Sequence, residues 1–156
     1  MNNAGLSLVF SALVATVAGQ VTCPDSWTHY GSSCYAFYNM KANFIEASSL
    51  CSSFGGSYLA EIETEGENLH IKAYMQLQNT DGVDGVWLGG NDIMSEGLWV
   101  WDKSETSIQY FDWGSGQPDD SGSKQNCMSL WKHFAFKWAD HYCTDKLAFL
   151  CEQPAK

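Results

Sequence analysis

The 156-residue sequence contains no arginine and only three prolines, and after residue 18 it has no apolar run of the ~20 residues that span a membrane. Eight lysines oppose 18 aspartates and glutamates, so the formal net charge is −10. An acidic chain repels phosphate backbones, and a chain without arginine makes no bidentate guanidinium contacts to guanine or phosphate. The sequence therefore predicts no nucleic-acid partner and no membrane span in the mature protein.

Motifs that carry enzyme chemistry are also missing. The sequence has no Gly-x-Ser-x-Gly elbow, no His-Glu-x-x-His pair, no phosphate-binding glycine loop and no dinucleotide fingerprint. No two cysteines lie two to four residues apart, which disfavours a zinc site. Paired carboxylates occur, but nothing marks one of them as a general acid. The sequence predicts a protein that is not an enzyme.

The amino terminus has the composition of a secretory leader. Residues 1–22 carry no charged side chain, and an apolar run of 13 residues from Leu6 to Ala18 ends in small residues. This pattern predicts a signal peptide over residues 1–19 and a secreted, extracellular protein. The alternative, a membrane anchor, would need a longer apolar run. No linker or repeat interrupts the remainder, so residues 20–156 are expected to form one domain.

The chain has six cysteines, an even number, which in a secreted protein favours three disulfides over free thiols. Their number alone permits fifteen pairings. Loop length favours two short-range bridges and leaves one long-range bridge. The short-range pairs are Cys23–Cys34 and Cys127–Cys143, and the remaining long-range pair is Cys51–Cys151.

Apolar periodicity predicts an α+β fold. A helix is expected over residues 44–54, and a second helix follows a capping-box pattern at residues 64–67. Leu69, Ala73 and Leu77 mark the expected buried face of this second helix. Short aromatic or aliphatic runs then predict strands near residues 86–88, 98–101, 128–131, 136–138 and 147–151. Residues 102–126 show little periodicity, and an irregular segment of this length is more often functional than idle.

Several motifs, taken in order, resemble the C-type lectin-like domain family over nearly all of the mature chain. They are Trp87-Leu88-Gly89-Gly90, Trp99 with Trp101, Gln117-Pro118-Asp119, and Trp138-Ala139-Asp140. The resemblance implies two helices, short antiparallel strands, a long irregular calcium- and sugar-binding loop, and the three disulfides paired as above. The extra amino-terminal bridge is similar to that of the long-form subgroup, and the layout resembles secreted invertebrate lectins of the perlucin-like, shell-matrix type.

The resemblance also implies Ca²⁺ as a cofactor at two sites. Calcium takes six to eight oxygen ligands, and a cis proline between Gln117 and Asp119 would direct both side chains toward one ion. The implied primary ligands are Gln117, Asp119, Gln125 and Asp140. The implied auxiliary ligands are Asp92, Glu96, Asp120 and Asn126. Gln125 and Ala139 depart from the Glu and Asn that family members usually carry, which leaves the primary site with fewer oxygen ligands.

The order of amide and acid in Gln117-Pro118-Asp119 resembles the galactose-type motif of the family. The sugar would bind to the four primary residues and stack on an aromatic ring, for which Trp131 is the first candidate, with His133 behind it. The other tryptophans of the motifs are expected to pack in the core.

Two functions follow from the resemblance. The first is a secreted, calcium-dependent lectin for terminal galactose or N-acetylgalactosamine, on microbial or self glycans in defence. The alternative is a module of the same fold with a degenerate sugar site, which binds protein or shell-matrix mineral. The intact triplet favours the first function, and the departures at Gln125 and Ala139 favour the second.

Overall fold

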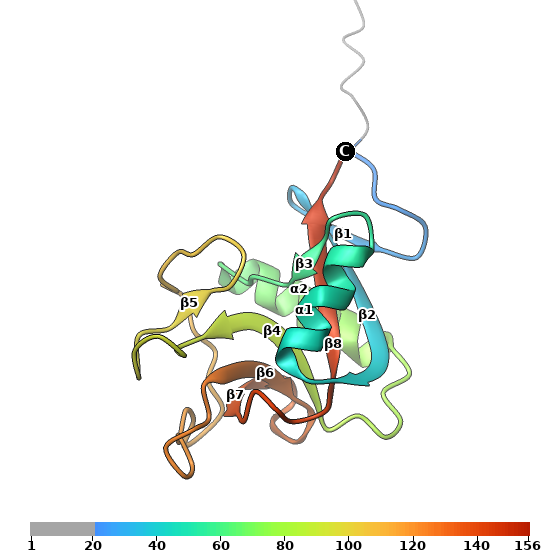
Figure 1. The fold of residues 1–156 in the computed structure, drawn as a ribbon. Helices are drawn as coiled ribbons and strands as arrows, with labels where there is room; N and C mark the ends of the chain where they lie inside the picture. Colours follow the sequence, from blue (N-terminus) through green and yellow to red (C-terminus); the bar gives the residue numbers. More distant parts are fainter. Residues whose placement is uncertain (1–20) are drawn as a thin grey trace, which may run out of the picture.

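The computed structural model describes residues 21–156 (Figure 1). The predicted signal peptide, residues 1–19, lies outside the described residues. In residues 21–156, no helix has both the length and the apolar character needed to cross a membrane.

Eight strands and two α-helices make up the described part of the chain. In order they are β1 (Thr28–Tyr30), β2 (Ser33–Ala42), α1 (Phe44–Ser53), β3 (Tyr58–Leu59), α2 (Glu65–Leu77), β4 (Gly85–Asn91), β5 (Val100–Trp101), β6 (Cys127–Trp131), the 3-10 helix η1 (Lys132–Phe134), β7 (Lys137–His141) and β8 (Leu147–Pro154). The sheet runs β1-β2-β8-β4-β6-β7, with β3 paired to β8 and β5 to β4. Only the β4–β8 contact is parallel among these pairs. The predicted α+β fold is confirmed.

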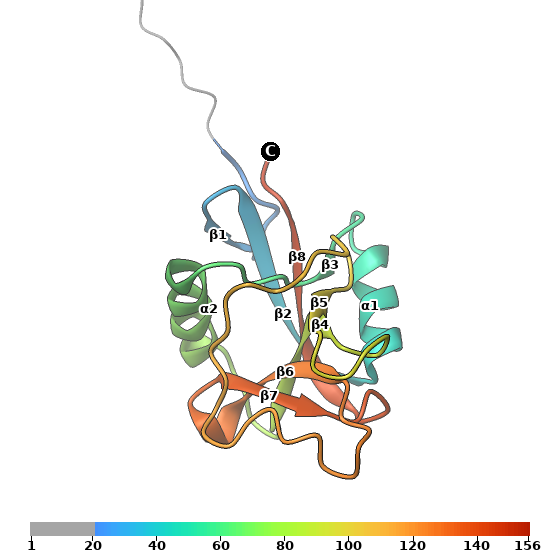
Figure 2. The same cartoon turned by 90° about the vertical axis from the view of Figure 1, so that its left-hand side faces the viewer.

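The two helices lie on opposite sides of β2 and β8 (Figure 2). α1 begins with a complete capping box, in which Asn43 Oδ1 accepts from Glu46 N at 2.8 Å and Glu46 Oε2 accepts from Asn43 N at 2.9 Å. α2 begins at Thr64, whose hydroxyl accepts from Glu67 N at 3.2 Å. The Glu67 carboxylate accepts from Glu63 N at 2.8 Å, not from Thr64 N, so the predicted box at 64–67 is formed in one direction only.

The predicted buried face of α2 is wrong. Leu69, Ala73 and Leu77 are exposed, and the buried residues are Glu67, Asn68, Ile71 and Met75. The physical reason is that polar side chains of α2 have partners in the core. Trp138 Nε1 donates to Asn68 Oδ1 at 3.2 Å, and Asn68 Nδ2 donates to Asp112 Oδ2 at 2.8 Å. A buried, hydrogen-bonded amide on the core side sets the orientation of the helix and leaves apolar residues facing solvent.

The tryptophans pack as the sequence predicts. Trp87, Trp101 and Trp138 are fully buried, and Trp99 contacts the half-buried Trp113 edge to face at 4.9 Å between ring centroids. All three predicted disulfides are present, and the described residues contain no free cysteine. The Cys51–Cys151 bridge ties α1 to β8, the central strand of the fold.

Three buried carboxylates lie where β8, α2 and the segment after β3 meet. Glu61, Glu67 and Glu152 are each 8% exposed or less, and in residues 21–156 none of them forms an ion pair. Backbone amides replace the missing cations, because Glu152 Oε2 accepts from Glu61 N and Glu61 Oε1 accepts from the amides of Lys103 and Ser104, all at 2.9 Å. Burial, followed by the charges of Glu67 and Glu61, raises the pKa of Glu152 to about 7.

This raised pKa predicts a pH-dependent stability. Between pH 4.5, the ordinary value, and about 7, folded Glu152 keeps a proton that the unfolded chain releases. The free energy of unfolding therefore falls as pH rises through this window, by up to about 3 kcal/mol. Glu152→Gln removes the titration, so urea midpoints at pH 5, 6, 7 and 8 should fall less steeply for the variant than for the unmutated protein. Parallel curves for the two proteins would contradict this assignment.

Candidate calcium and carbohydrate site

The long segment between β5 and β6 lies against β7 before it reaches the triplet (Figure 2). Trp138 N in β7 donates to Asp112 O at 2.9 Å, and Gly114 N donates to Trp138 O at 2.8 Å. Trp113 and Trp138 form an isolated bridge at the same place. These contacts bring residues 117–125 alongside the end of β7, where Asp140 lies.

The peptide bond between Gln117 and Pro118 is cis, as the resemblance implies. The side chains of Gln117 and Asp119 converge, and Gln117 Nε2 donates to Asp119 Oδ2 at 3.3 Å. Asp119 is exposed and Gln117 is half-buried, so a ligand can reach both side chains.

Asp140 fastens this loop to β7. The residue is 2% exposed, and its two carboxylate oxygens accept from the backbone amides of Asp119 at 3.0 Å and Asp120 at 2.7 Å. The Asp140 amide in turn donates to Gln117 Oε1 at 3.3 Å. Charge-assisted bonds to backbone amides are stronger than neutral ones. Asp140 is therefore the residue that holds the triplet in place.

Gln125 closes the loop from its other end. Gln125 Oε1 accepts from Ser121 N at 2.6 Å, and Gln125 N donates to Asp120 Oδ1 at 3.1 Å. The four predicted primary residues thus belong to one hydrogen-bonded network of two carboxylates and two amides. Ala139 is buried and contributes no side-chain oxygen. Within the part of the chain that is described, no three His, Cys, Asp or Glu side chains are grouped as a metal site.

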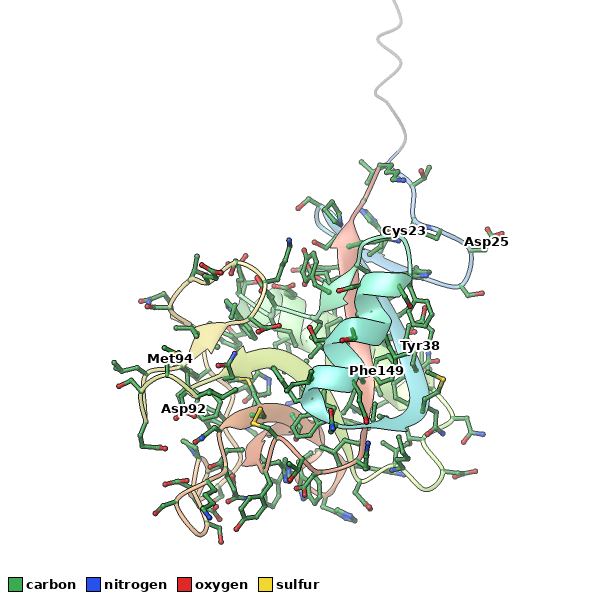
Figure 3. The ribbon with its side chains drawn as sticks, in the orientation of Figure 1. Cys23, Asp25, Tyr38, Asp92, Met94 and Phe149 are labelled. Carbon is green, nitrogen blue, oxygen red and sulfur yellow. A yellow bond between two sulfur atoms is a disulfide. The ribbon has the colours of Figure 1, made fainter. Side chains whose placement is uncertain are left out.

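In the auxiliary set, the carboxylates of Asp92 and Glu96 lie close enough to interact, although no three carboxylates of the described residues are grouped as a metal site. Asp92 is 2% exposed and follows β4, on the edge of the molecule that also carries Met94 (Figure 3). Asp92 Oδ2 accepts from Gly97 N at 2.8 Å, whereas Asp92 Oδ1 is buried without a hydrogen-bond partner. Burial raises the pKa of Asp92, and desolvation with the charges of Asp92 and Asp120 raises the pKa of Glu96. A bound cation would relieve the repulsion between these carboxylates and would take the unpartnered Asp92 oxygen as a ligand. The chemistry of this place therefore fits a hard cation such as Ca²⁺.

Comparison with known proteins decides the family. The sequence profile described as "Lectin C-type domain" matches residues 40–153. The chain belongs to the C-type lectin family. Members of this family are carbohydrate-binding and not enzymes, and they generally bind Ca²⁺.

Relatives of this lectin cover most of its length. It is 31% identical to a C-type lectin mannose-binding isoform of Oxyuranus scutellatus (94% of this chain, 93% of that protein). It is 28% identical to a perlucin-like protein of Mytilus galloprovincialis (94% and 96%) and 32% identical to the galactose-specific lectin nattectin of Thalassophryne nattereri (83% and 79%).

Solved structures of other C-type lectin-like proteins share the fold. The mouse scavenger receptor C-type lectin carbohydrate-recognition domain superposes with a TM-score of 0.76 at 29% identity, covering 86% of this chain and all of that one. A calcium-independent type II antifreeze protein superposes with a TM-score of 0.76 at 26% identity, covering 89% and 99%. The predicted family and fold are thereby confirmed.

The structure does not bring Trp131 and His133 to the triplet of this lectin. Trp131 pairs with Lys137, three residues from Asp140, and side chains alternate along a strand, so Trp131 and Asp140 project from opposite faces. The Trp131 ring packs against His141, with 4.5 Å between ring centroids. His133 is exposed and lies 3.4 Å from Asp84, before the start of β4, whereas the auxiliary site follows the end of that strand. We therefore leave both residues out of the proposed sugar site.

Sequence reasoning missed Tyr142 as a member of the site. Its hydroxyl donates to Ser121 O at 2.9 Å, so it supports the loop opposite to Asp140. Gly122 lies so close that a Cβ there would be 2.6 Å from this hydroxyl, and its φ of +73° is a conformation that glycine favours. The sequence signal that could have identified Tyr142 was its position as an aromatic residue two places after Asp140.

Proposed function

We propose that this C-type lectin is secreted and binds terminal galactose or N-acetylgalactosamine with the help of Ca²⁺. The observation that carries the proposal is the convergence of Gln117 and Asp119 at an exposed position held by Asp140. Gln117, Asp119, Gln125 and Asp140 would hold the primary ion, and Asp92, Glu96, Asp120 and Asn126 the auxiliary ion. When bound, the primary ion would supply direct coordination of two vicinal sugar hydroxyls.

The hydrogen-bonding groups of the triplet support galactose as the proposed sugar. The Gln117 amide can donate a hydrogen bond to a sugar hydroxyl, and the Asp119 carboxylate can only accept one. A hydroxyl pair therefore has to present an acceptor on the Gln117 side and a donor on the Asp119 side. Exchange of amide and acid would reverse this requirement and select a different hydroxyl geometry.

The relatives support the lectin class but differ in the sugar that they are named for. The proposed sugar therefore rests on the triplet. Nattectin is galactose-specific, whereas the Oxyuranus relative is called mannose-binding, at nearly equal identity. The triplet of this chain has the galactose order. Three disulfides suit an oxidising compartment, which supports a cleaved signal peptide over residues 1–19 and a mature domain over 20–156. Galactose-type glycans on microbial surfaces are the partners we propose.

Affinity chromatography tests this function. The folded, secreted protein is expected to be retained on galactose resin in millimolar Ca²⁺ and released by EDTA. The double variant Gln117→Glu with Asp119→Asn keeps the charge of the loop and should shift retention from galactose to mannose resin. Retention on neither resin, with native circular dichroism, would refute the proposal.

One observation favours a second candidate, a calcium-independent protein-binding or mineral-associated module. Asp140 and Gln125 already use their oxygens to accept from backbone amides, so hydrogen bonds hold the loop without an ion. A calcium-independent antifreeze protein shares the fold. For this candidate, binding to the partner would be unchanged by EDTA and by Asp119→Ala.

A further inference from the structure

A hollow lies beside the triplet loop, on the side that Tyr142 faces. Its volume is about 350 Å³, which falls among small-ligand pockets of about 300–1,000 Å³. The lining residues are Ile93, Lys124, Asn126, Tyr142, Cys143 and Thr144. Ile93 and Tyr142 give it apolar walls and are 53% and 38% exposed, while Lys124, Asn126 and Thr144 place polar groups around them. An apolar surface with a polar rim matches the face of a pyranose ring.

The walls of this hollow are held in place. Cys143 is bonded to Cys127 at the start of β6, and its carbonyl accepts from Phe44 N at 3.0 Å. The Tyr142 ring is fixed at its outer end by the hydrogen bond from its hydroxyl to Ser121 O. A ring that is already oriented loses little conformational entropy when a ligand packs on it.

The hollow lies next to the proposed galactose site, because Tyr142 in its wall contacts Ser121, which in turn contacts Asp119. Ser121 N donates to Asp119 Oδ1 at 3.1 Å, and Ser121 O accepts from the Tyr142 hydroxyl at 2.9 Å. One residue therefore connects the two places, and the Tyr142 hydroxyl lies within about 10 Å of the Asp119 carboxylate. A disaccharide is long enough to reach both places. Lys124 is exposed and has no ion pair in residues 21–156, so its ammonium is available to a ligand.

We propose that this hollow is a second sugar subsite, which packs the pyranose ring next to the terminal galactose against Tyr142 and Ile93. The proposal rests on the proposed galactose function and extends it from a monosaccharide to a disaccharide. Lys124 donates to hydroxyls of the second ring, and Tyr142 provides the stacking surface.

Comparison of lactose with methyl β-galactoside tests the subsite, because both present the same terminal galactose and only lactose has a second ring. Isothermal titration in Ca²⁺ should give about threefold to tenfold tighter binding of lactose. Ile93→Ser, which leaves the loop hydrogen bonds intact, should remove most of this preference and leave methyl β-galactoside binding unchanged. Tyr142→Ala should remove the preference, whereas Tyr142→Phe retains the ring without its hydrogen bond to Ser121 and should retain part of the preference.

Saturation-transfer NMR gives a second measurement, in which protons of the glucose ring of lactose should receive saturation from the protein and lose it in Ile93→Ser. Equal affinity for lactose and methyl β-galactoside in the unmutated protein would overturn the subsite and leave the galactose function standing. Absence of binding to both sugars would overturn the subsite together with the galactose function.

Discussion

Asp140→Asn is expected to abolish retention on galactose resin and to lower the free energy of unfolding by about 2–4 kcal/mol. The buried carboxylate accepts from the amides of Asp119 and Asp120 with separate oxygens. The asparagine side chain has one carbonyl oxygen, so its amide group would face a backbone donor and leave a buried N–H without an acceptor. The triplet would lose its attachment to β7, and the site would lose one of two carboxylates. Resin retention and urea unfolding measure the two effects.

Asp145→Asn is the matched control for this substitution. Asp145 lies nearby, is more exposed, and its carboxylate contacts only His141 at 3.9 Å among the ion pairs of the described residues. A pair this far apart, with an exposed carboxylate, contributes little, so the control should change stability by less than about 0.5 kcal/mol and leave retention intact. If Asp140→Asn behaves like the control, Asp140 does not hold the loop.

Removal of the Cys51–Cys151 bridge is expected to have the largest effect on stability. The two cysteines are 100 residues apart and fully buried, and they join α1 to the central strand β8. In the chain-entropy model a loop of this length stabilises the fold by about 4–5 kcal/mol, which is a large part of the ~5–15 kcal/mol typical of a domain. The double variant Cys51→Ala with Cys151→Ala should therefore unfold at much lower urea, as followed by circular dichroism.

The control is the amino-terminal bridge, Cys23–Cys34, whose cysteines are 11 residues apart. The same model makes the long bridge about 2 kcal/mol more stabilising than this short one. Cys23→Ala with Cys34→Ala should therefore be clearly more stable than the double variant of the long bridge. Equal losses for the two bridges would show that loop closure does not determine their contributions.

The sequence predicted the features that depend on residue order and apolar spacing. α1 covers Phe44–Ser53 where a helix over residues 44–54 was expected, the tryptophans form the core, and the cysteines pair as expected. Gly89 shows why the motif around Trp87 carries glycine, because a Cβ at Gly89 would lie 2.7 Å from the Leu59 carbonyl oxygen. Features of this kind are local, or they repeat in a fixed order, so they can be recognised without coordinates.

The features that the sequence could not predict depend on partners far apart in the chain. The orientation of α2 follows from a contact between Asn68 and Trp138, 70 residues apart. The projection of Trp131 away from Asp140 follows from the β6–β7 register, since a shift of one residue would reverse it. Tyr142 enters the site only through its bond to Ser121, 21 residues earlier. Polar and register-dependent contacts leave no periodic pattern in the sequence.

Calorimetric titration of Ca²⁺ into the metal-free protein at physiological salt tests the central claim most directly. The account predicts a saturable heat with a Kd of about 10⁻⁴ to 10⁻³ M, the range of extracellular modules, because few carboxylates line each site. It also predicts that Asp92→Asn removes the part of this heat that belongs to the auxiliary ion, since Asp92 has the buried oxygen without a partner. Absence of any heat from the unmutated protein would contradict the account.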